Sequence, residues 1–172
     1  MSPAEILLLA VVAQRLGELV LARRNTARLR ARGAFEIAPR HYPLIVAVHA
    51  AWLLSLWLFG RDQPLHIIAL LVYVALQGFR VWVMGTLGAR WTTRIMVLPA
   101  EPLVTKGPYR FISHPNYAVV SAEIMVLPLV LGLPLVAVIF SILNAVVLAV
   151  RIRAENTALA DCRGLPAAHA QG

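Results

Sequence analysis

The chain has 172 residues, of which 60% are hydrophobic and 14% are charged. An ordinary soluble domain carries roughly 25% charged residues, so this composition indicates an integral membrane protein. The formal net charge is +8, but the arginines flank apolar segments and do not alternate with aromatic residues on a soluble face, which argues against nucleic-acid binding and for contact with anionic lipid headgroups.

Four apolar segments are long enough to cross a bilayer, whose core of about 30 Å requires roughly 20 helical residues. They cover residues 4–22, 42–59, 65–84 and 117–150. The last is too long for one span and carries prolines and a glycine near its middle, which predicts two helices joined by a tight turn. We therefore expect an all-α integral membrane fold of about five transmembrane helices, with a helical hairpin and a cytoplasmic C-terminal helix.

The basic residues gather on one side of these predicted spans. Residues 23–40 contain six arginines, residues 86–113 contain four further cations, and the tail after residue 150 begins with two more. On the other side, one loop contains Arg61 beside Asp62, and the turn at Gly132 contains no lysine or arginine. The positive-inside rule therefore predicts an N-terminus outside and a C-terminus in the cytoplasm of an inner or plasma membrane.

We expect a single integral-membrane domain over residues 1–172, because no internal repeat or linker divides the chain. Residues 1–85 hold three N-terminal spans, residues 86–163 the remaining helices and the polar segments between them, and residues 164–172 a tail. The first apolar segment lacks a cleavage site and is expected to be retained. No metal is expected, because no His, Cys or acidic residues share ligand spacing.

Polar residues inside predicted spans are costly and need partners. Gln14 and Glu18 share a face of the first span, and Gln77 and Arg80 lie three apart in the third. Glu18 and Arg80 fall at similar depth, so we expect them to pair as a structural tie between these two spans.

The last two predicted helices carry polar stripes that are open to two interpretations. Asn116 and Glu123 share one face of the fourth helix, and Asn144, Arg151 and Glu155 share one face of the fifth. These residues either form hydrogen bonds between the two helices, or the helix ends at residues 114–117 and 151–155 form two walls of a polar pocket.

Two motifs resemble those of a known family. The string GPYRFISHPNYAVV at residues 107–120, followed after the hairpin by RIRAENTAL at 151–159, is similar to the isoprenylcysteine carboxyl methyltransferase family. The resemblance covers about the last 85 residues and implies S-adenosylmethionine bound at the cytoplasmic side. It therefore implies that the helical hairpin and the cytoplasmic C-terminal helix form the cofactor site, and that residues 86–163 are the cofactor-binding part. Carried over by position, it implies cofactor contacts from Tyr109, His114, Pro115, Tyr117, Arg151 and Glu155. The chain departs from the family pattern at Ser113, Asn156 and Val119, where Arg, Glu and Gly are usual.

The residue types in these motifs suit a sulfonium methyl donor. Its carboxylate suits Arg110 or Arg151, its ammonium suits Glu155, and its adenosine part suits Tyr109 or Tyr117. His114 is the single candidate for a catalytic base in the motif, and a weak one, because a hydroxypyrone or a carboxylic acid ionises near neutral pH without help.

Three further stretches, HYPLIVAVHAAW, RVWVMGTLGARWTTRIMVLP and RIRAEN, resemble a short bacterial branch of that family that accompanies type III polyketide synthases. This branch implies O-methylation of a long-chain alkylpyrone or alkylresorcinol, with a polyketide synthase as pathway partner. Trp91 and Arg94 are then expected at the membrane interface, where they guide the lipid-like acceptor.

Other functions remain open at this stage. They are carboxyl methylation of an isoprenylcysteine, N-methylation of a phospholipid, reduction by an NADPH-dependent membrane enzyme, and a non-enzymatic membrane scaffold or carrier.

Overall fold

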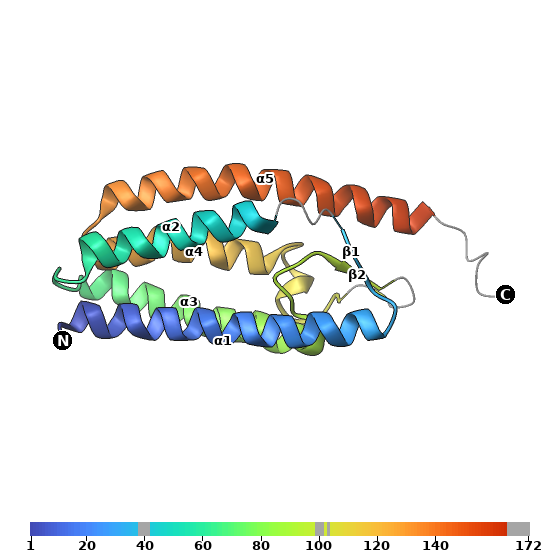
Figure 1. Cartoon of the computed structure of the whole chain (residues 1–172), viewed down its shortest axis with the longest axis horizontal. Coiled ribbons are helices and arrows are strands. Elements are labelled where there is room, and N and C mark those ends of the chain that lie inside the picture. The colour runs from blue at the N-terminus through green and yellow to red at the C-terminus, as the bar shows by residue number, and fades with distance from the viewer. Residues whose placement is uncertain (38–41, 99–101, 103, 165–172) are drawn as a thin grey trace.

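The protein is built from α-helices. The computed structural model describes residues 1–37, 42–98, 102 and 104–164, with side chains up to residue 153. In chain order its elements are α1 (Pro3–Ala31), β1 (Phe35–Glu36), α2 (Tyr42–Gly60), α3 (Ile67–Leu87), the 3₁₀ turn η2 (Gly88–Arg90), β2 (Met96–Val97), the 3₁₀ turn η3 (Gly107–Arg110), α4 (Pro115–Val130) and α5 (Pro134–Gly164). The described chain is thus all-helical apart from one two-stranded ribbon (Figure 1).

Helix α1 begins with a capping box. The Ser2 hydroxyl accepts a hydrogen bond from the Glu5 backbone N–H at 3.0 Å, and the Glu5 carboxylate accepts one from the Ser2 N–H at 2.8 Å. These bonds satisfy N–H groups that a helix start leaves without partners. The helix continues past the predicted span to Ala31, so much of the arginine-rich segment expected as a loop is helical. Its 29 residues extend about 43 Å, beyond the thickness of a bilayer core.

The predicted division of the last apolar segment into two helices is confirmed. Helix α4 ends at Val130, and the Leu133 N–H donates to the Pro128 carbonyl at 2.9 Å to close the turn before α5. Gly132 lies in this turn with φ +67°, a conformation that residues with a Cβ rarely adopt. The turn is therefore set by the glycine, while Pro134 opens the next helix where its missing N–H costs nothing.

The prediction of about five spans is met in part. Among the described residues, three helices are long and apolar enough to cross a membrane, namely α2, α3 and the first twenty residues of α5. Helix α4 is apolar but has 16 residues, about 24 Å, and α1 carries charges within its length. Large apolar side chains also face outward, among them Ile68 at 78% and Leu135 at 75% exposure. Such an exterior agrees with an integral membrane protein.

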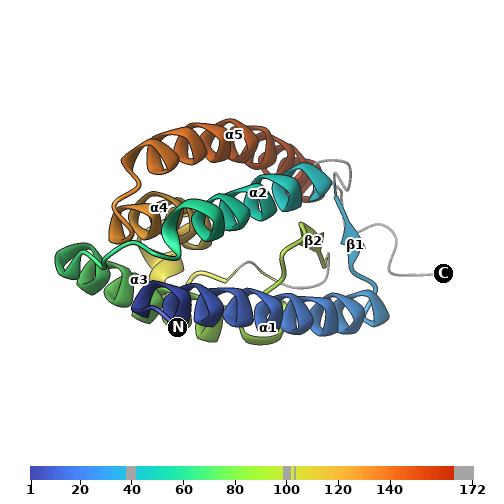
Figure 2. The ribbon, with the colours of Figure 1, turned by 60° about the vertical axis from the view of Figure 1, so that its left-hand side comes forward.

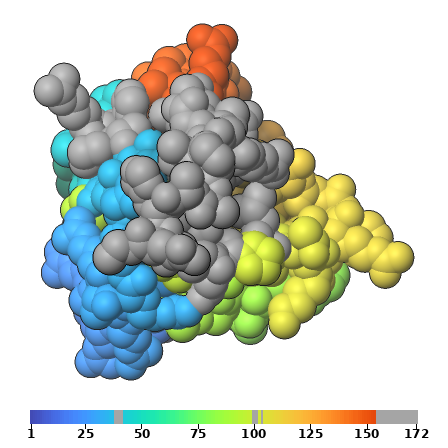
Figure 3. All heavy atoms as spheres, turned by 90° about the vertical axis from the view of Figure 1, so that its right-hand side faces the viewer, coloured from blue at the N-terminus to red at the C-terminus, as the bar shows by residue number. Residues whose placement is uncertain are grey.

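The helices pack lengthwise in a bundle with two unlike ends. Helices α1 and α3 run along one side and α5 along the opposite side, with α2 and α4 between them (Figures 1 and 2). The main apolar core, which includes Leu8, Trp52, Leu56 and Leu127, fills the end near the N-terminus. The other end holds the ribbon, both 3₁₀ turns and most of the cations that the structure describes; we call it the basic end (residues 23–37, 86–98, 102, 104–114 and 151–164). Figure 3 looks onto this end, with α5 above, α1 at the lower left and residues 107–114 at the right.

Candidate functional site

The start of α4 and the C-terminal half of α5 meet at the basic end. Pro115 occupies the first turn of α4, with His114 as the residue before it. The His114 and Tyr117 rings stack with centroids 5.2 Å apart and planes 16° from parallel. The Arg151 Nε of α5 donates to the Tyr117 hydroxyl at 2.8 Å, and its guanidinium carbon lies 5.3 Å from the centre of the Tyr117 ring. The structure thus brings three of the predicted cofactor residues into one aromatic and cationic cluster.

Arg151 is also held by a second hydrogen bond, from a different segment of the chain. Its Nη2 donates to the backbone carbonyl of Thr93 at 2.9 Å, and the Thr93 hydroxyl lies 3.2 Å from the Tyr42 hydroxyl at the start of α2. Among the side chains that the structure describes, none accepts a hydrogen bond from Nη1 of Arg151. A guanidinium held in place by two bonds, with one N–H edge still to be used, is suited to a carboxylate ligand. Sequence reasoning missed Thr93, because a backbone carbonyl leaves no pattern in the side chains.

The other predicted cofactor residues lie in η3 and further along α5. Tyr109 and Arg110 lie in η3, where Tyr109 is half-buried and Arg110 is exposed. The Arg110 guanidinium lies 5.8 Å from the centre of the Phe111 ring. Glu155 and Asn156 lie about one turn beyond Arg151 in α5. Their side chains fall outside the described part of the chain.

The two residues expected to guide the acceptor occupy different surroundings. Trp91 is 2% exposed, so its side chain is enclosed by protein, and its expected place at the membrane interface stays a prediction. Its Nε1 donates to the Asn116 side chain at 3.4 Å, and the Asn25 side chain of α1 donates to the Trp91 carbonyl at 2.8 Å. These bonds tie α1 to the start of α4 through the segment after α3. The side chain of Trp91 is buried because it fills the space between those helices.

Arg94 is partly exposed and belongs to the ribbon. Its Nη1 donates to Glu36 at 2.5 Å, and its guanidinium lies 4.3 Å from the centre of the Tyr42 ring. Glu36 also pairs with Arg30 of α1 at 2.7 Å. Strands β1 and β2 are antiparallel, with Phe35 opposite Val97. Arg94 therefore helps to fasten the ribbon next to the segment that carries Thr93.

Deeper in the bundle, four charged side chains form a closed network. The predicted pair of Glu18 and Arg80 is confirmed, with Arg80 Nε donating to Glu18 at 2.6 Å. Arg80 and Arg15 both donate to Glu123 of α4, each at 2.7 Å. Gln77 donates to the other Glu123 oxygen at 2.8 Å. Two positive and two negative charges balance, which is how ionised groups are retained in an apolar interior.

The structure bears on the first of the two interpretations of the Asn116 and Glu123 stripe, in which it bonds to α5: the hydrogen-bond partners that the structure gives these two side chains lie in other segments. Glu123 points to α1 and α3, and Asn116 accepts from Trp91. Contact with α5 is made by Tyr117 and Ser121, which are four residues apart on a neighbouring face; Ser121 accepts from the Asn144 amide at 3.0 Å. The stripe was visible in the sequence, but its partner depended on how α4 is rotated in the bundle.

Comparison with known proteins decides the family. The sequence model of the isoprenylcysteine carboxyl methyltransferase family matches residues 67–161, more than half of the chain. The chain belongs to this family. Its members are methyltransferases, so the conserved chemistry of the group is methyl transfer, and the matched region contains both helix ends of the site described above.

Two curated relatives cover nearly the whole chain. An uncharacterized protein of Bacillus subtilis strain 168, YpbQ, is 42% identical over 163 residues, which are 91% of this chain and 96% of the relative. An uncharacterized protein of Haemophilus influenzae is 25% identical over 157 residues, 87% of this chain and 90% of the relative. No solved structure matches the chain significantly. The likeness therefore extends to the N-terminal spans, beyond the region of the family match.

Proposed function

We propose that the protein is an S-adenosylmethionine-dependent O-methyltransferase that acts at the cytoplasmic face of the membrane on a lipid-like acceptor, specifically a long-chain alkylpyrone. The observation that carries this proposal is the cluster of His114, Tyr117 and Arg151, in which the start of α4 and the body of α5 meet. Family membership supplies the reaction type, and the cluster supplies a place for it.

The chemistry of the cluster fits the cofactor. Arg151 offers a charge-assisted hydrogen bond to a carboxylate, because its Nη1 is not used by any described side chain. The stacked rings of His114 and Tyr117 offer an apolar surface to an adenosine group. Glu155, one turn along α5, is the residue that we assign to the ammonium group. When bound, S-adenosylmethionine supplies an activated methyl group on a sulfonium sulfur.

With an alkylpyrone acceptor, the chain's own residues orient the two reactants and do not need to transfer a proton. Hydrogen bonds to the Tyr117 hydroxyl and the Thr93 carbonyl hold the Arg151 guanidinium in one orientation. That orientation fixes the position of a ligand bound by the guanidinium. Correct alignment of two reactants alone lowers a barrier by about 7 to 11 kcal/mol. An alkylpyrone enol is already ionised near neutral pH, whereas a resorcinol phenol, with a pKa near 10, needs a base. His114 is the residue we assign to that role if the acceptor is a phenol.

The apolar exterior supports an acceptor that arrives through the bilayer. Exposed apolar side chains continue along α3 and α5 up to the basic end, with Val81 at 70% and Val146 at 61% exposure. A water-soluble cofactor and an oily acceptor would then meet where these helices leave the membrane. The family description favours a second candidate, an isoprenylcysteine-type acceptor methylated at its carboxylate.

Binding and labelling experiments test the proposal in two steps. Titration calorimetry in detergent measures affinity for S-adenosylmethionine and for NADPH, with Arg151→Gln as the site variant and the exposed Arg153→Gln as its matched control. We expect S-adenosylmethionine to bind, and Arg151→Gln to weaken it by tenfold or more, while Arg153→Gln changes it little. Binding of NADPH alone contradicts the proposal.

The acceptor is identified by methyl transfer from labelled cofactor. Membranes containing the protein are incubated with an alkylpyrone, an alkylresorcinol and a farnesylated cysteine. Transfer to the alkylpyrone supports the first candidate, and transfer to the farnesylated cysteine supports the second. Label on phospholipid headgroups contradicts both.

A further inference from the structure

The two-stranded ribbon is fastened to the end of α1 by charged hydrogen bonds. Strand β1 follows α1 and leads toward α2 (Figure 2). The Glu36 carboxylate accepts from Arg30 of α1 at 2.7 Å and from Arg94 at 2.5 Å, and its side chain is only 10% exposed. The Ile37 N–H donates to the Ile95 carbonyl at 2.9 Å, which extends the pairing of the strands. The ribbon therefore holds the Arg94 side chain in a defined place.

Tyr42 connects that arginine to the neighbouring residue of the chain. The Arg94 guanidinium lies 4.3 Å from the centre of the Tyr42 ring, within the range of a cation–π contact. The Tyr42 hydroxyl, at the start of α2, lies 3.2 Å from the Thr93 hydroxyl. One tyrosine thus contacts Arg94 with its ring and Thr93 with its hydroxyl.

The bend at residues 92–94 turns the backbone of Thr93 toward α5. The Thr92 hydroxyl donates to the Arg94 carbonyl at 2.6 Å, a local bond of the kind that shapes turns. The Thr93 carbonyl accepts from Nη2 of Arg151 at 2.9 Å. Thr93 is therefore held through its side chain and presents its backbone to the candidate cofactor cluster.

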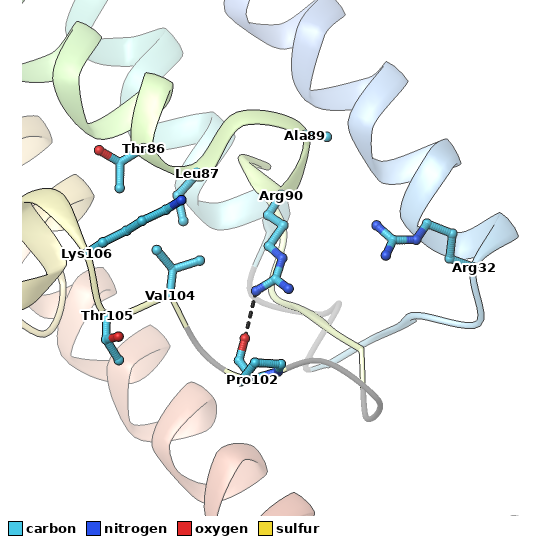
Figure 4. Close-up of a pocket in the computed structure, with 9 residues that line it drawn as sticks. All are labelled: Arg32, Thr86, Leu87, Ala89, Arg90, Pro102, Val104, Thr105 and Lys106. Atoms are coloured by element: carbon cyan, nitrogen blue, oxygen red, sulfur yellow. Dashed lines mark hydrogen bonds between the residues drawn. The ribbon is translucent and has the colours of Figure 1, made fainter.

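The start of the same segment, just after α3, is fixed from the other side. The Asn25 side chain of α1 donates to the Gly88 carbonyl at 3.3 Å and to the Trp91 carbonyl at 2.8 Å. Nη1 of Arg90 donates to the Pro102 carbonyl at 2.7 Å (Figure 4). With the start of the segment held in this way, the contacts of the ribbon and of α2 decide where the bend at residues 92–94 lies.

We propose that the ribbon positions Arg151 for the cofactor, with Glu36 and Tyr42 as positioning residues that act through Arg94 and Thr93. The inference rests on the proposed function, in which the Arg151 guanidinium binds the carboxylate of S-adenosylmethionine. When the Thr93 carbonyl is no longer held, the guanidinium keeps one of its two described hydrogen bonds and must be ordered as the ligand binds. That ordering costs affinity, so residues that never touch the cofactor should control how tightly it binds.

The guanidinium can be followed without any cofactor. In the full-length protein labelled with ¹⁵N-arginine in detergent micelles, the Nε–H signal of Arg151 is assigned by its loss in Arg151→Gln. We expect Tyr42→Phe, which keeps the ring and removes the hydroxyl, and Glu36→Gln to shift or broaden this signal. The matched controls are Tyr73→Phe, in the apolar core, and Asp62→Asn, whose exposed carboxylate pairs with its neighbour Arg61; both should leave the signal unchanged.

Calorimetry with S-adenosylmethionine measures the consequence for binding. We expect Tyr42→Phe to weaken the affinity about fivefold, the size of one neutral hydrogen bond. Glu36→Gln should weaken it by a similar factor, whereas Glu36→Asp, which keeps the charge, should restore part of the affinity. In an Arg151→Gln background Tyr42→Phe should change the affinity by less than about twofold, because residues that act through one contact are not additive. An equal fivefold loss in both backgrounds would show that Tyr42 acts independently of Arg151, and would overturn the proposal.

The two measurements separate this inference from the function on which it rests. If the unmodified protein binds no S-adenosylmethionine but the Arg151 signal responds to Tyr42→Phe, the positioning is supported and the proposed function fails. If S-adenosylmethionine binds and Arg151→Gln weakens it, while Tyr42→Phe and Glu36→Gln change neither the signal nor the affinity, the positioning is refuted and the proposed function stands.

Discussion

Removing the charge of Glu123 should destabilise the bundle far more than removing an ordinary hydrogen bond. The Glu123 carboxylate is fully buried and accepts from Arg15, Arg80 and Gln77. Glu123→Gln keeps the shape but leaves the buried Arg80 and the half-buried Arg15 with Glu18 as their single remaining carboxylate partner among the described residues. Breaking a buried ion pair in this way costs about 3–5 kcal/mol. A neutral hydrogen bond between membrane helices is worth about 0.6 kcal/mol on average, so the charge should dominate the loss.

A second substitution separates charge from shape. In the double variant Arg15→Gln with Glu123→Gln, Arg80 and Glu18 remain as a balanced pair. We expect this double variant to be more stable than Glu123→Gln by itself, although it lacks one more side-chain bond. Unfolding in mixed micelles, followed by helical circular dichroism, measures the free energies. Ser121→Ala, which removes the neutral bond from Asn144, is the control and should cost less than about 1 kcal/mol. The reasoning would be refuted if Glu123→Gln lowered the free energy of unfolding no more than Ser121→Ala does. It would also be refuted if the double variant lost as much free energy of unfolding as the two single variants lose together.

Three further outcomes follow from single contacts. Tyr117→Phe removes the hydroxyl that accepts from Arg151, a loss of about 1.5–3 kcal/mol for a charged partner, and should weaken S-adenosylmethionine binding about tenfold in calorimetry without abolishing expression. Asn25→Ala removes the donor to two backbone carbonyls after α3 and should lower the free energy of unfolding by about 1–3 kcal/mol; an unchanged midpoint in mixed micelles would contradict this. Gly132→Ala should destabilise by about 1 kcal/mol or more, since its φ is +67° and its Cβ would lie 3.0 Å from His66, whereas Gly17→Ala in an open stretch of α1 should stabilise by about 0.5–1 kcal/mol, with both changes measured by the thermal midpoint in detergent.

The sequence by itself determined the features that depend on composition and local order. Apolar segments of bilayer length predicted the helices, and the turn residues around Gly132 predicted the hairpin. The pairing of Glu18 with Arg80 could be predicted because an isolated charge in an apolar span needs a partner at its own depth. The motif at residues 107–120 led to the family because its polar residues are adjacent in the chain, so that no fold is needed to recognise it.

Only the tertiary structure decided which way each helix faces. In a water-soluble bundle the apolar stripe marks the buried side, but here the exterior is as apolar as the core, so periodicity cannot distinguish them. For this reason the sequence left open whether the stripe with Glu123 bonds to α5 or lines a pocket, whereas packing turned Glu123 to the arginines of α1 and α3. Packing likewise decided that the Trp91 side chain is buried. The Arg151 bond to the Thr93 carbonyl was equally hidden, because a backbone acceptor from a distant segment is defined only when the chain has folded.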